Sequence, residues 1–191
     1  MNVLMLGPQG AGKGTQAKRI AAEYGIPHIA TGDMLRAAMA AHTPFGRQVQ
    51  PIYDAGRLVP DELMIGLIRE RLSEDDATDG FVLDGFPRTM AQAEALDAML
   101  REIDRELDIV FELQLPEGVC IDRLTKRAAE EGRADDTPEA IRTRLDLYHR
   151  ETEPLVEHYR TTGNVVGIDA DRPVDAVFAQ IQDVLEQVAV R

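Results

Sequence analysis

The chain has 191 residues, of which 44% are hydrophobic and 29% are charged, and this composition is typical of a globular protein of one domain. Its net charge of −13 argues against a general nucleic-acid-binding protein, because binding to a phosphate backbone requires clustered Lys and Arg. The single cysteine, Cys120, excludes an intrachain disulfide and a four-thiolate zinc site. The sequence shows neither a secretion signal nor an apolar run long enough to span a membrane, so we expect a cytosolic protein.

Short apolar runs alternate with longer amphipathic segments, which indicates parallel βαβ units with helices on both faces of a sheet. The predicted strands are residues 2–6, 28–30, 81–83, 109–115 and 165–168. The predicted helices are residues 13–24, 31–41, 46–55, 60–73, 89–106, 116–127, 137–161 and 173–189. Ligands of such sheets bind beyond the carboxyl ends of the strands, where Thr31 and Asp84 are expected.

Polar residues mark several helix boundaries. Thr31 can cap a helix that begins at Gly32, and Thr137 precedes Pro138 and Glu139 at the start of the longest predicted helix. The mostly helical region between the second and third strands exceeds a minimal crossover, so part of it is expected to protrude as a subdomain. The nine polar residues between Arg127 and Thr137 are expected to form a short mobile loop.

The stretch Gly7-Pro-Gln-Gly-Ala-Gly-Lys-Gly-Thr15 stands between the first predicted strand and the first predicted helix. This context makes the pattern G-x-x-x-x-G-K a phosphate-binding loop, in which backbone N–H groups form an anion-binding nest at a helix N-terminus. Lys13 is expected to reach the outer phosphates of a nucleotide. Gly14 follows the lysine, so the expected hydroxyl is displaced by one position to Thr15. The alternative is an ordinary tight turn before a helix.

A second candidate segment, residues 84–89, begins at the end of the third strand. A carboxylate at a strand tip beside a phosphate loop can hold Mg²⁺, usually through waters, so Asp84 is a metal candidate as well as a possible turn residue. Gly85 permits close backbone approach, and Pro87 can fix an unusual turn, including one with a cis bond. Arg88 would present a planar donor fork to a phosphate, although an exposed loop arginine is the alternative.

Further arginines lie on the apolar faces of predicted helices. Arg123 and Arg127 share one face with apolar residues, Arg144 does so on a later helix, and Arg133 lies in the loop between them. Arginines in such positions should be paired or should bind a ligand. Structural ion pairing is the alternative, since the chain has 34 acidic residues to supply partners.

Five parts of the chain match one family pattern: residues 7–16, 31–36, 54–59, 80–92 and the arginine set within 122–144. Through them, and over essentially its whole length, the chain resembles the adenylate kinases of the nucleoside monophosphate kinase family. The resemblance implies the reaction ATP + AMP ⇌ 2 ADP with Mg²⁺ as cofactor, in a monomer that has no nucleic-acid or membrane partner.

The same resemblance implies a P-loop fold built on a five-stranded parallel sheet. The implied core comprises residues 1–29, 60–126 and 138–191. A helical monophosphate-binding subdomain is expected at residues 30–59 and a short lid at residues 127–137.

The family's functional residues carry over to matching positions in this chain. The implied ATP-binding residues are Gly10, Ala11, Gly12, Lys13, Gly14, Thr15, Arg123, Arg127 and the main chain near Arg172. The implied AMP-binding residues are Thr31, Arg36, Arg57, Leu58, Val59, Gly85, Phe86, Pro87, Arg88, Gln92, Arg133 and Arg144. The implied catalytic residues are Lys13, Arg88, Arg123, Arg133 and Arg144, with Asp84 holding Mg²⁺ through water.

The chain departs from the family pattern in two ways. Gln9 stands where the family often has proline, and the lid lacks the longer inserted domain of many bacterial members, which brings the chain closer in form to UMP/CMP kinases. Thr31 and Gln92 match the adenylate members, and an amide can present both a donor and an acceptor to adenine. A UMP/CMP kinase and a regulator that holds ATP without transfer are the alternatives.

Overall fold

The computed structural model describes residues 1–133, 136–161 and 164–189. Its centre is a sheet of five strands in the order β2-β3-β1-β4-β5, and every neighbouring pair is parallel. The strands are β1 (Asn2–Leu6), β2 (His28–Ala30), β3 (Phe81–Asp84), β4 (Ile109–Gln114) and β5 (Val165–Asp169). The predicted five-stranded parallel sheet is therefore confirmed.

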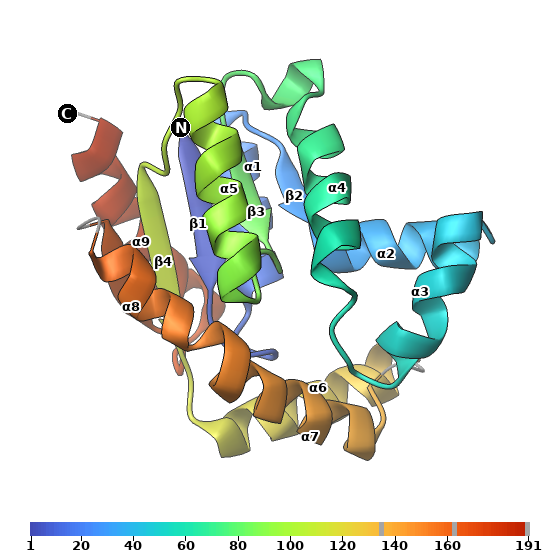
Figure 1. Cartoon of the computed structure of the whole chain (residues 1–191). Helices are drawn as coiled ribbons and strands as arrows, with labels where there is room; N and C mark the ends of the chain where they lie inside the picture. The colour runs from blue at the N-terminus through green and yellow to red at the C-terminus, as the bar shows by residue number, and fades with distance from the viewer. Residues whose placement is uncertain (134–135, 162–163, 190–191) are drawn as a thin grey trace.

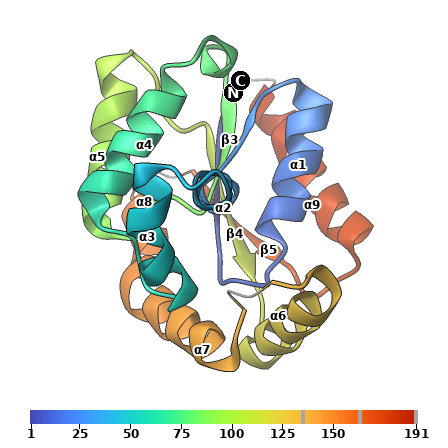
Figure 2. The same cartoon turned by 90° about the vertical axis from the view of Figure 1, so that its right-hand side faces the viewer.

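Helices cover both faces of this sheet (Figures 1 and 2). They are α1 (Lys13–Tyr24), α2 (Thr31–Ala40), α3 (Pro44–Asp54), α4 (Asp61–Leu72), α5 (Met90–Glu102), α6 (Glu117–Glu131), α7 (Pro138–Leu147), α8 (Pro154–Arg160) and α9 (Val174–Ala189). A 3₁₀ turn, η1 (Asp75–Ala77), precedes β3, and a π-helical turn, η2 (Tyr148–Thr152), separates α7 from α8. Within the described ranges, no helix is both long and apolar enough to cross a membrane.

The central strands are apolar at nearly every position because both of their faces are buried. In β1, Leu4 and Leu6 pack with α4, α5 and α8, whereas Val3 and Met5 pack with α1 and α9 on the opposite face. Figure 2 shows the sheet edge-on between these two groups of helices. Since β1 is the middle strand, the loop that follows it opens at the centre of the sheet.

Two pairs of helices extend beyond the body of the sheet. In Figure 1, α2 and α3 project to one side, while α6 and α7 lie past the carboxyl ends of the strands. The apolar core continues into the first pair, because Leu35 and Val49 are buried in the same cluster as α4 and α5. This arrangement fits the expected protrusion between β2 and β3, although the boundaries 30–59 and 127–137 stay predictions.

The predicted helix over residues 137–161 is wrong as a single element. It starts as expected, with the Thr137 side chain accepting a hydrogen bond from the Ala140 N–H. It is interrupted near Pro154, which has no N–H to continue the i→i−4 ladder. The preceding Glu153 N–H instead reaches back five residues to the Tyr148 carbonyl at 2.8 Å, which produces the π-helical turn.

Two other local expectations need correction. Thr31 does not cap the second helix, because α2 already includes it and its hydroxyl donates to the Asp84 carbonyl at 3.4 Å. Helix α6 continues past Arg127 to Glu131, since the intervening alanines and glutamates favour helix, and ends at Gly132 with φ 63°. The expected loop is therefore shorter, and its residues Ala134 and Asp135 lie outside the described residues.

Truncation of a core side chain on α4 tests this packing. Ile68 is 0% exposed in the core cluster. We expect Ile68→Ala to lower the free energy of unfolding by about 2–5 kcal/mol through lost burial and a residual cavity. Ile103→Ala is the control, because Ile103 is 50% exposed, and we expect a change within about 0.5 kcal/mol. Urea denaturation measures both, and equal losses would contradict the assigned core.

Candidate active site

A cleft of about 490 Å³ lies at the carboxyl ends of the strands, between α2 and α3 on one side and α6 and α7 on the other. It brings together most of the predicted site residues. These are Gly10, Gly12, Lys13, Gly14, Thr15, Arg36, Arg57, Asp84, Gly85, Arg88, Arg123, Arg127, Arg133 and Arg144.

The loop after β1 has the geometry that the sequence predicts. Gly10 and Gly12 have φ 87° and 88°, a region that strongly favours glycine, and Gly12 directly precedes α1. Lys13 folds back over the loop, where its Nζ donates to the Gly7 carbonyl at 2.7 Å and the Pro8 carbonyl at 2.9 Å. The lysine thus closes the loop in this structure, and its contact with outer phosphates stays a prediction.

Burial lowers the pKa of Lys13 to about 8. The negative charge of Asp84 raises this pKa, and the positive charge of Arg88 lowers it further. A buried ammonium group is costly unless negative charge or hydrogen bonds offset the loss of hydration. The site thus holds a cation whose charge a bound anion would stabilise.

Asp84 is the last residue of β3 and faces the phosphate loop. Burial by itself would raise the pKa of its carboxyl group, but His28, Lys13 and Arg88 outweigh burial and hold that pKa below its usual value. His28 Nε2 lies 3.6 Å from Asp84 Oδ2, which is longer than a hydrogen bond. An ionised carboxylate therefore stands beside Lys13 at the floor of the cleft.

The segment after β3 holds Arg88 in the cleft. The Phe86–Pro87 peptide bond is cis, as considered from the sequence. Gly85 has φ 85°, and a Cβ there would lie 2.5 Å from the Thr31 hydroxyl oxygen, so both backbone conformation and space favour glycine at this position. The Nε of Arg88 donates to the Gly85 carbonyl at 2.8 Å. Burial lowers the pKa of this guanidinium group from its very high usual value.

Gln92 does not line the cleft, although the resemblance assigns it to AMP. It is 2% exposed, and both ends of its amide are occupied: Nε2 donates to Asp61 Oδ1 at 2.7 Å, and Oε1 accepts from the Arg88 N–H at 2.8 Å. In this structure Gln92 braces the backbone of Arg88. A contact with adenine requires these bonds to be exchanged, so it stays a prediction.

Seven other assigned residues also lie outside the cleft lining: Ala11, Thr31, Leu58, Val59, Phe86, Pro87 and Arg172. Val59 and Phe86 belong to the apolar core. The side chain of Arg172 turns to Asp169, with Nε and Oδ2 2.7 Å apart. Only the main chain near Arg172 was expected at the nucleotide, and Val174, two residues later, does line the cleft.

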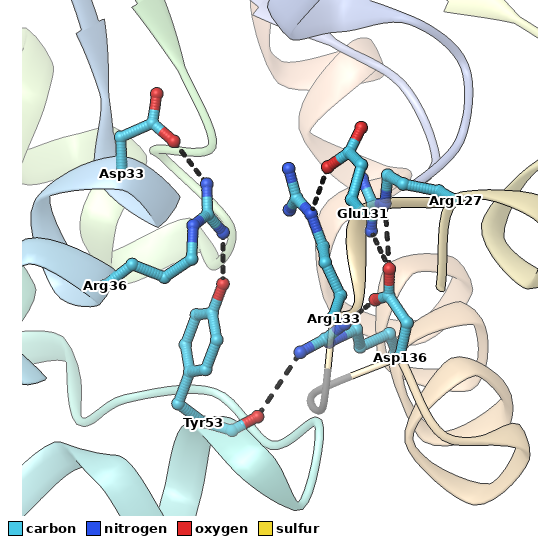
Figure 3. A network of polar contacts seen from close by, with 8 residues as sticks. Asp33, Arg36, Tyr53, Arg127, Glu131, Arg133 and Asp136 are labelled. Atoms are coloured by element: carbon cyan, nitrogen blue, oxygen red, sulfur yellow. Dashed lines mark hydrogen bonds and ion pairs between the residues drawn. The ribbon is translucent and has the colours of Figure 1, made fainter. Parts of the chain in front are cut away.

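Asp136 holds two of the predicted arginines together (Figure 3). Its carboxylate is completely buried, with Arg144 Nη1 2.6 Å from Oδ1 and Arg127 Nη2 2.6 Å from Oδ2. Arg127 Nε also donates to Oδ2 at 2.8 Å. This shared carboxylate offsets the repulsion between the two guanidinium groups and places both at the cleft.

Three further arginines are bound to other oxygen atoms. Arg133 pairs with Glu131 at 2.7 Å, and Arg123 donates to the Ala170 carbonyl at 3.1 Å. Arg36 contacts the Asp33 carboxylate and the Tyr53 hydroxyl (Figure 3). The structural ion pairing considered from the sequence is therefore present, yet all of these arginines also line one cleft, as predicted.

Sequence reasoning assigned no role to several residues that line the cleft. They are Gln9, Lys18, His28, Ala30, Gly32, Asp33, Tyr53, Leu124, Glu131 and Val174. Asp33 lies in the segment that matches the family pattern, and Gln9 was noted as a departure from it. Tyr53 lies in a predicted helix and has no local signature, so only the packing of α3 against the cleft reveals it. Among the described residues, Gln9 Oε1 is buried without a hydrogen-bond partner.

Substitution of Lys13 tests the cost of its burial. The pKa of Lys13 is about 8 in the folded protein, against 10.5 for an unperturbed lysine in the unfolded chain. Between these two pH values the unfolded chain binds more protons than the folded protein. The free energy of unfolding of the wild type therefore falls as the pH is lowered from 10.5 to 8. We define the gain of Lys13→Met as its free energy of unfolding minus that of wild type, both measured without nucleotide. We expect this gain to be larger at pH 7 than at pH 10.5, by roughly 3 kcal/mol. Urea denaturation at both pH values measures this difference.

The exposed Lys18 supplies the control. We expect Lys18→Met to show no comparable pH dependence relative to wild type. If the stability difference between Lys13→Met and wild type does not change with pH, the lowered pKa of Lys13 is contradicted.

Comparisons with known proteins identify the family. A sequence model described as "Adenylate kinase" matches residues 5–164. A protein named adenylate kinase from Cyanothece sp. is 50% identical over 186 residues, covering 97% of this chain and 95% of its own length. Another, from Clavibacter michiganensis, is 50% identical over 189 residues and covers 99% and 94%. A third, from Archaeoglobus fulgidus, is 41% identical over 215 aligned residues and covers 98% and 99%. The chain therefore belongs to the adenylate kinase family.

Proposed function

We propose that this chain transfers the terminal phosphoryl group of ATP to AMP, reversibly, and so forms two molecules of ADP. The observation that carries the proposal is the gathering of cations in one cleft of a protein whose net charge is −13. They are Lys13, Lys18, Arg36, Arg57, Arg88, Arg123, Arg127, Arg133 and Arg144. Such a local excess of positive charge suits a ligand that carries many negative charges.

The arrangement of these cations supports two nucleotide sites. The phosphate loop, Arg123 and Arg127 form one end of the cleft and would hold ATP, with the main chain near Arg172 at its adenine. Arg36 and Arg57 come from the α2–α3 region and would hold AMP at the other end. A protein that only senses ATP has no need of this second group, so we favour transfer over a purely regulatory role.

The proposed chemistry needs positioning and charge neutralisation more than covalent assistance. An oxygen of the AMP phosphate attacks the γ-phosphorus of ATP, the bond from that phosphorus to the bridging oxygen breaks, and ADP leaves with the bond's electron pair. Lys13, Arg88 and Arg144 would brace the phosphoryl group during this exchange. Arg123 and Arg133 complete the proposed catalytic set, and no general base is required.

Asp84 is suited to bind Mg²⁺ through water, with the nucleotide phosphates supplying most of the other ligands. Within the described residues, no group of three or more His, Cys, Asp or Glu side chains could hold a metal ion. A single ionised carboxylate beside the phosphate loop suits Mg²⁺, which keeps several waters and binds through one or two carboxylates plus phosphates. When bound, the ion would neutralise charge on the phosphates of ATP.

Closure over the substrates would exclude water, which could otherwise accept the phosphoryl group. We propose residues 127–137 as the lid and residues 30–59 as the monophosphate-binding subdomain. The α6–α7 region contributes Arg127, Arg133 and Arg144, and α2–α3 contributes Arg36, so movement of either region would bring cations toward the phosphates. We further propose that the protein works as a cytosolic monomer, as the resemblance implies.

Product formation with different monophosphates tests the function. With ATP and Mg²⁺, we expect ADP to form rapidly with AMP and slowly with UMP or CMP, and we expect chelation of Mg²⁺ to abolish the reaction. Initial rates measured by chromatography decide the outcome. Preference for a pyrimidine would indicate a UMP/CMP kinase, and ATP binding without ADP formation would indicate a regulator. An analogue with two adenosines joined by five phosphates should raise the unfolding temperature.

Removal of the Arg88 side chain tests the bracing of the transferred group. Arg88 lines the cleft beside the phosphate loop. We expect Arg88→Ala to lower kcat by roughly 10³-fold, which is the scale of a transition-state arginine, while the far-ultraviolet circular dichroism stays unchanged. The control is Arg101→Ala, since Arg101 is exposed on α5. Near-normal turnover by a folded Arg88→Ala protein would remove Arg88 from the mechanism.

A further inference from the structure

Tyr53 lies between two arginines that line the cleft from different helices. Its hydroxyl oxygen accepts a hydrogen bond from Arg36 Nη1 at 2.5 Å, and Arg36 also contacts Asp33. Its main-chain carbonyl accepts from Arg144 Nη2 at 3.3 Å, and the Arg144 guanidinium carbon lies 5.3 Å from the centre of its ring. Figure 3 shows the tyrosine pointing from α3 toward Arg36.

The two arginines belong to the group proposed to bind the phosphate of AMP. Arg36 comes from α2 and Arg144 from α7, so they must approach one phosphate from separate elements. The phenol ring stands in the space between them, and its oxygen uses the donor Nη1 that a phosphate oxygen would need. The guanidinium group of Arg36 can bind two anionic oxygens of one ligand, whereas here it contacts the Asp33 carboxylate and the Tyr53 hydroxyl.

We propose that the phenol of Tyr53 occupies the phosphate position of the AMP subsite in the nucleotide-free protein, and that AMP must displace it. The inference rests on the proposed function, because it assigns this end of the cleft to the monophosphate. Tyr53 is then an internal competitor that sets the affinity for AMP without contacting the phosphate loop.

The competition follows from the chemistry of the two acceptors. A phosphate dianion is a stronger partner for Arg36 than a phenol oxygen, so AMP can take its place. The exchange nevertheless breaks the hydrogen bond to the hydroxyl and separates the ring from Arg144, and the apparent affinity for AMP is reduced by that cost. Removal of the hydroxyl alone should recover part of the affinity.

The test is the substitution Tyr53→Phe, which retains the ring and its packing. Titration calorimetry with AMP alone should show a dissociation constant lower by roughly 3- to 10-fold, the scale of one hydrogen bond. KM for AMP should fall in the same way, while KM for ATP stays unchanged. An unchanged or higher dissociation constant for AMP would overturn the inference, since the hydroxyl would then be neutral or would support the bound nucleotide.

A second tyrosine provides the matched control. Tyr24 packs at the end of α1, outside the cleft lining, so Tyr24→Phe should leave the affinity for AMP unchanged. Equal tightening in both variants would overturn the inference. If neither wild type nor variant binds AMP, the proposed function fails and this inference fails with it. If wild type binds AMP and Tyr53→Phe binds it no better, the inference fails alone.

Discussion

The positively charged side chains that line the cleft repel one another, and their close placement depends on carboxylate and carbonyl oxygens that accept hydrogen bonds from them. Asp136 is the clearest case, because its fully buried carboxylate receives hydrogen bonds from both Arg127 and Arg144. A buried carboxylate with this many charge-assisted bonds is well compensated, but it would be costly if either arginine were lost. The cations are therefore organised before a nucleotide arrives.

The same principle extends through the rest of the cleft. Lys13 donates to the carbonyls of its own loop, and Arg88 donates to the Gly85 carbonyl. Each of these oxygens gives the cation a partner while leaving it at the wall of the cleft. A polyphosphate offers several stronger acceptors at once, so binding can exchange these internal bonds for contacts with the ligand. On the proposed function, this exchange would link nucleotide binding to the proposed closure of the surrounding elements.

The sheet explains why cations from distant segments can share a cleft. The carboxyl ends of parallel strands meet at one edge, so the loop after β1 and Asp84 at the end of β3 become neighbours. Helices α2–α3 and α6–α7 then supply arginines from opposite sides.

The sequence alone predicted the parallel α/β sheet, the phosphate loop and the start of α7, and the family resemblance added most of the residues that line the cleft. The first three features depend on local chemistry: apolar runs for buried strands, glycines for positive φ, and threonine as the cap of α7. The sequence analysis missed the interruption after Leu147, because the helical periodicity on both sides of Pro154 outweighed the proline. It also ended the helix before the lid too early, at residue 127 instead of Glu131, because the residues that follow Arg127 resemble a loop in polarity and yet favour helix.

Tertiary structure alone decided the hydrogen bonds between residues that are far apart in the sequence. Arg144 and Tyr53 are 91 residues apart, and Gln92 and Asp61 are 31 apart, so neither contact has a local signal. Gln92 shows what a motif cannot specify. Its residue type and its place in the family pattern suit a contact with adenine, yet in the folded protein its amide forms hydrogen bonds with Asp61 and the backbone of Arg88. A motif specifies which groups are available, whereas the burial and mutual distance of those groups, set by the whole fold, determine their partners.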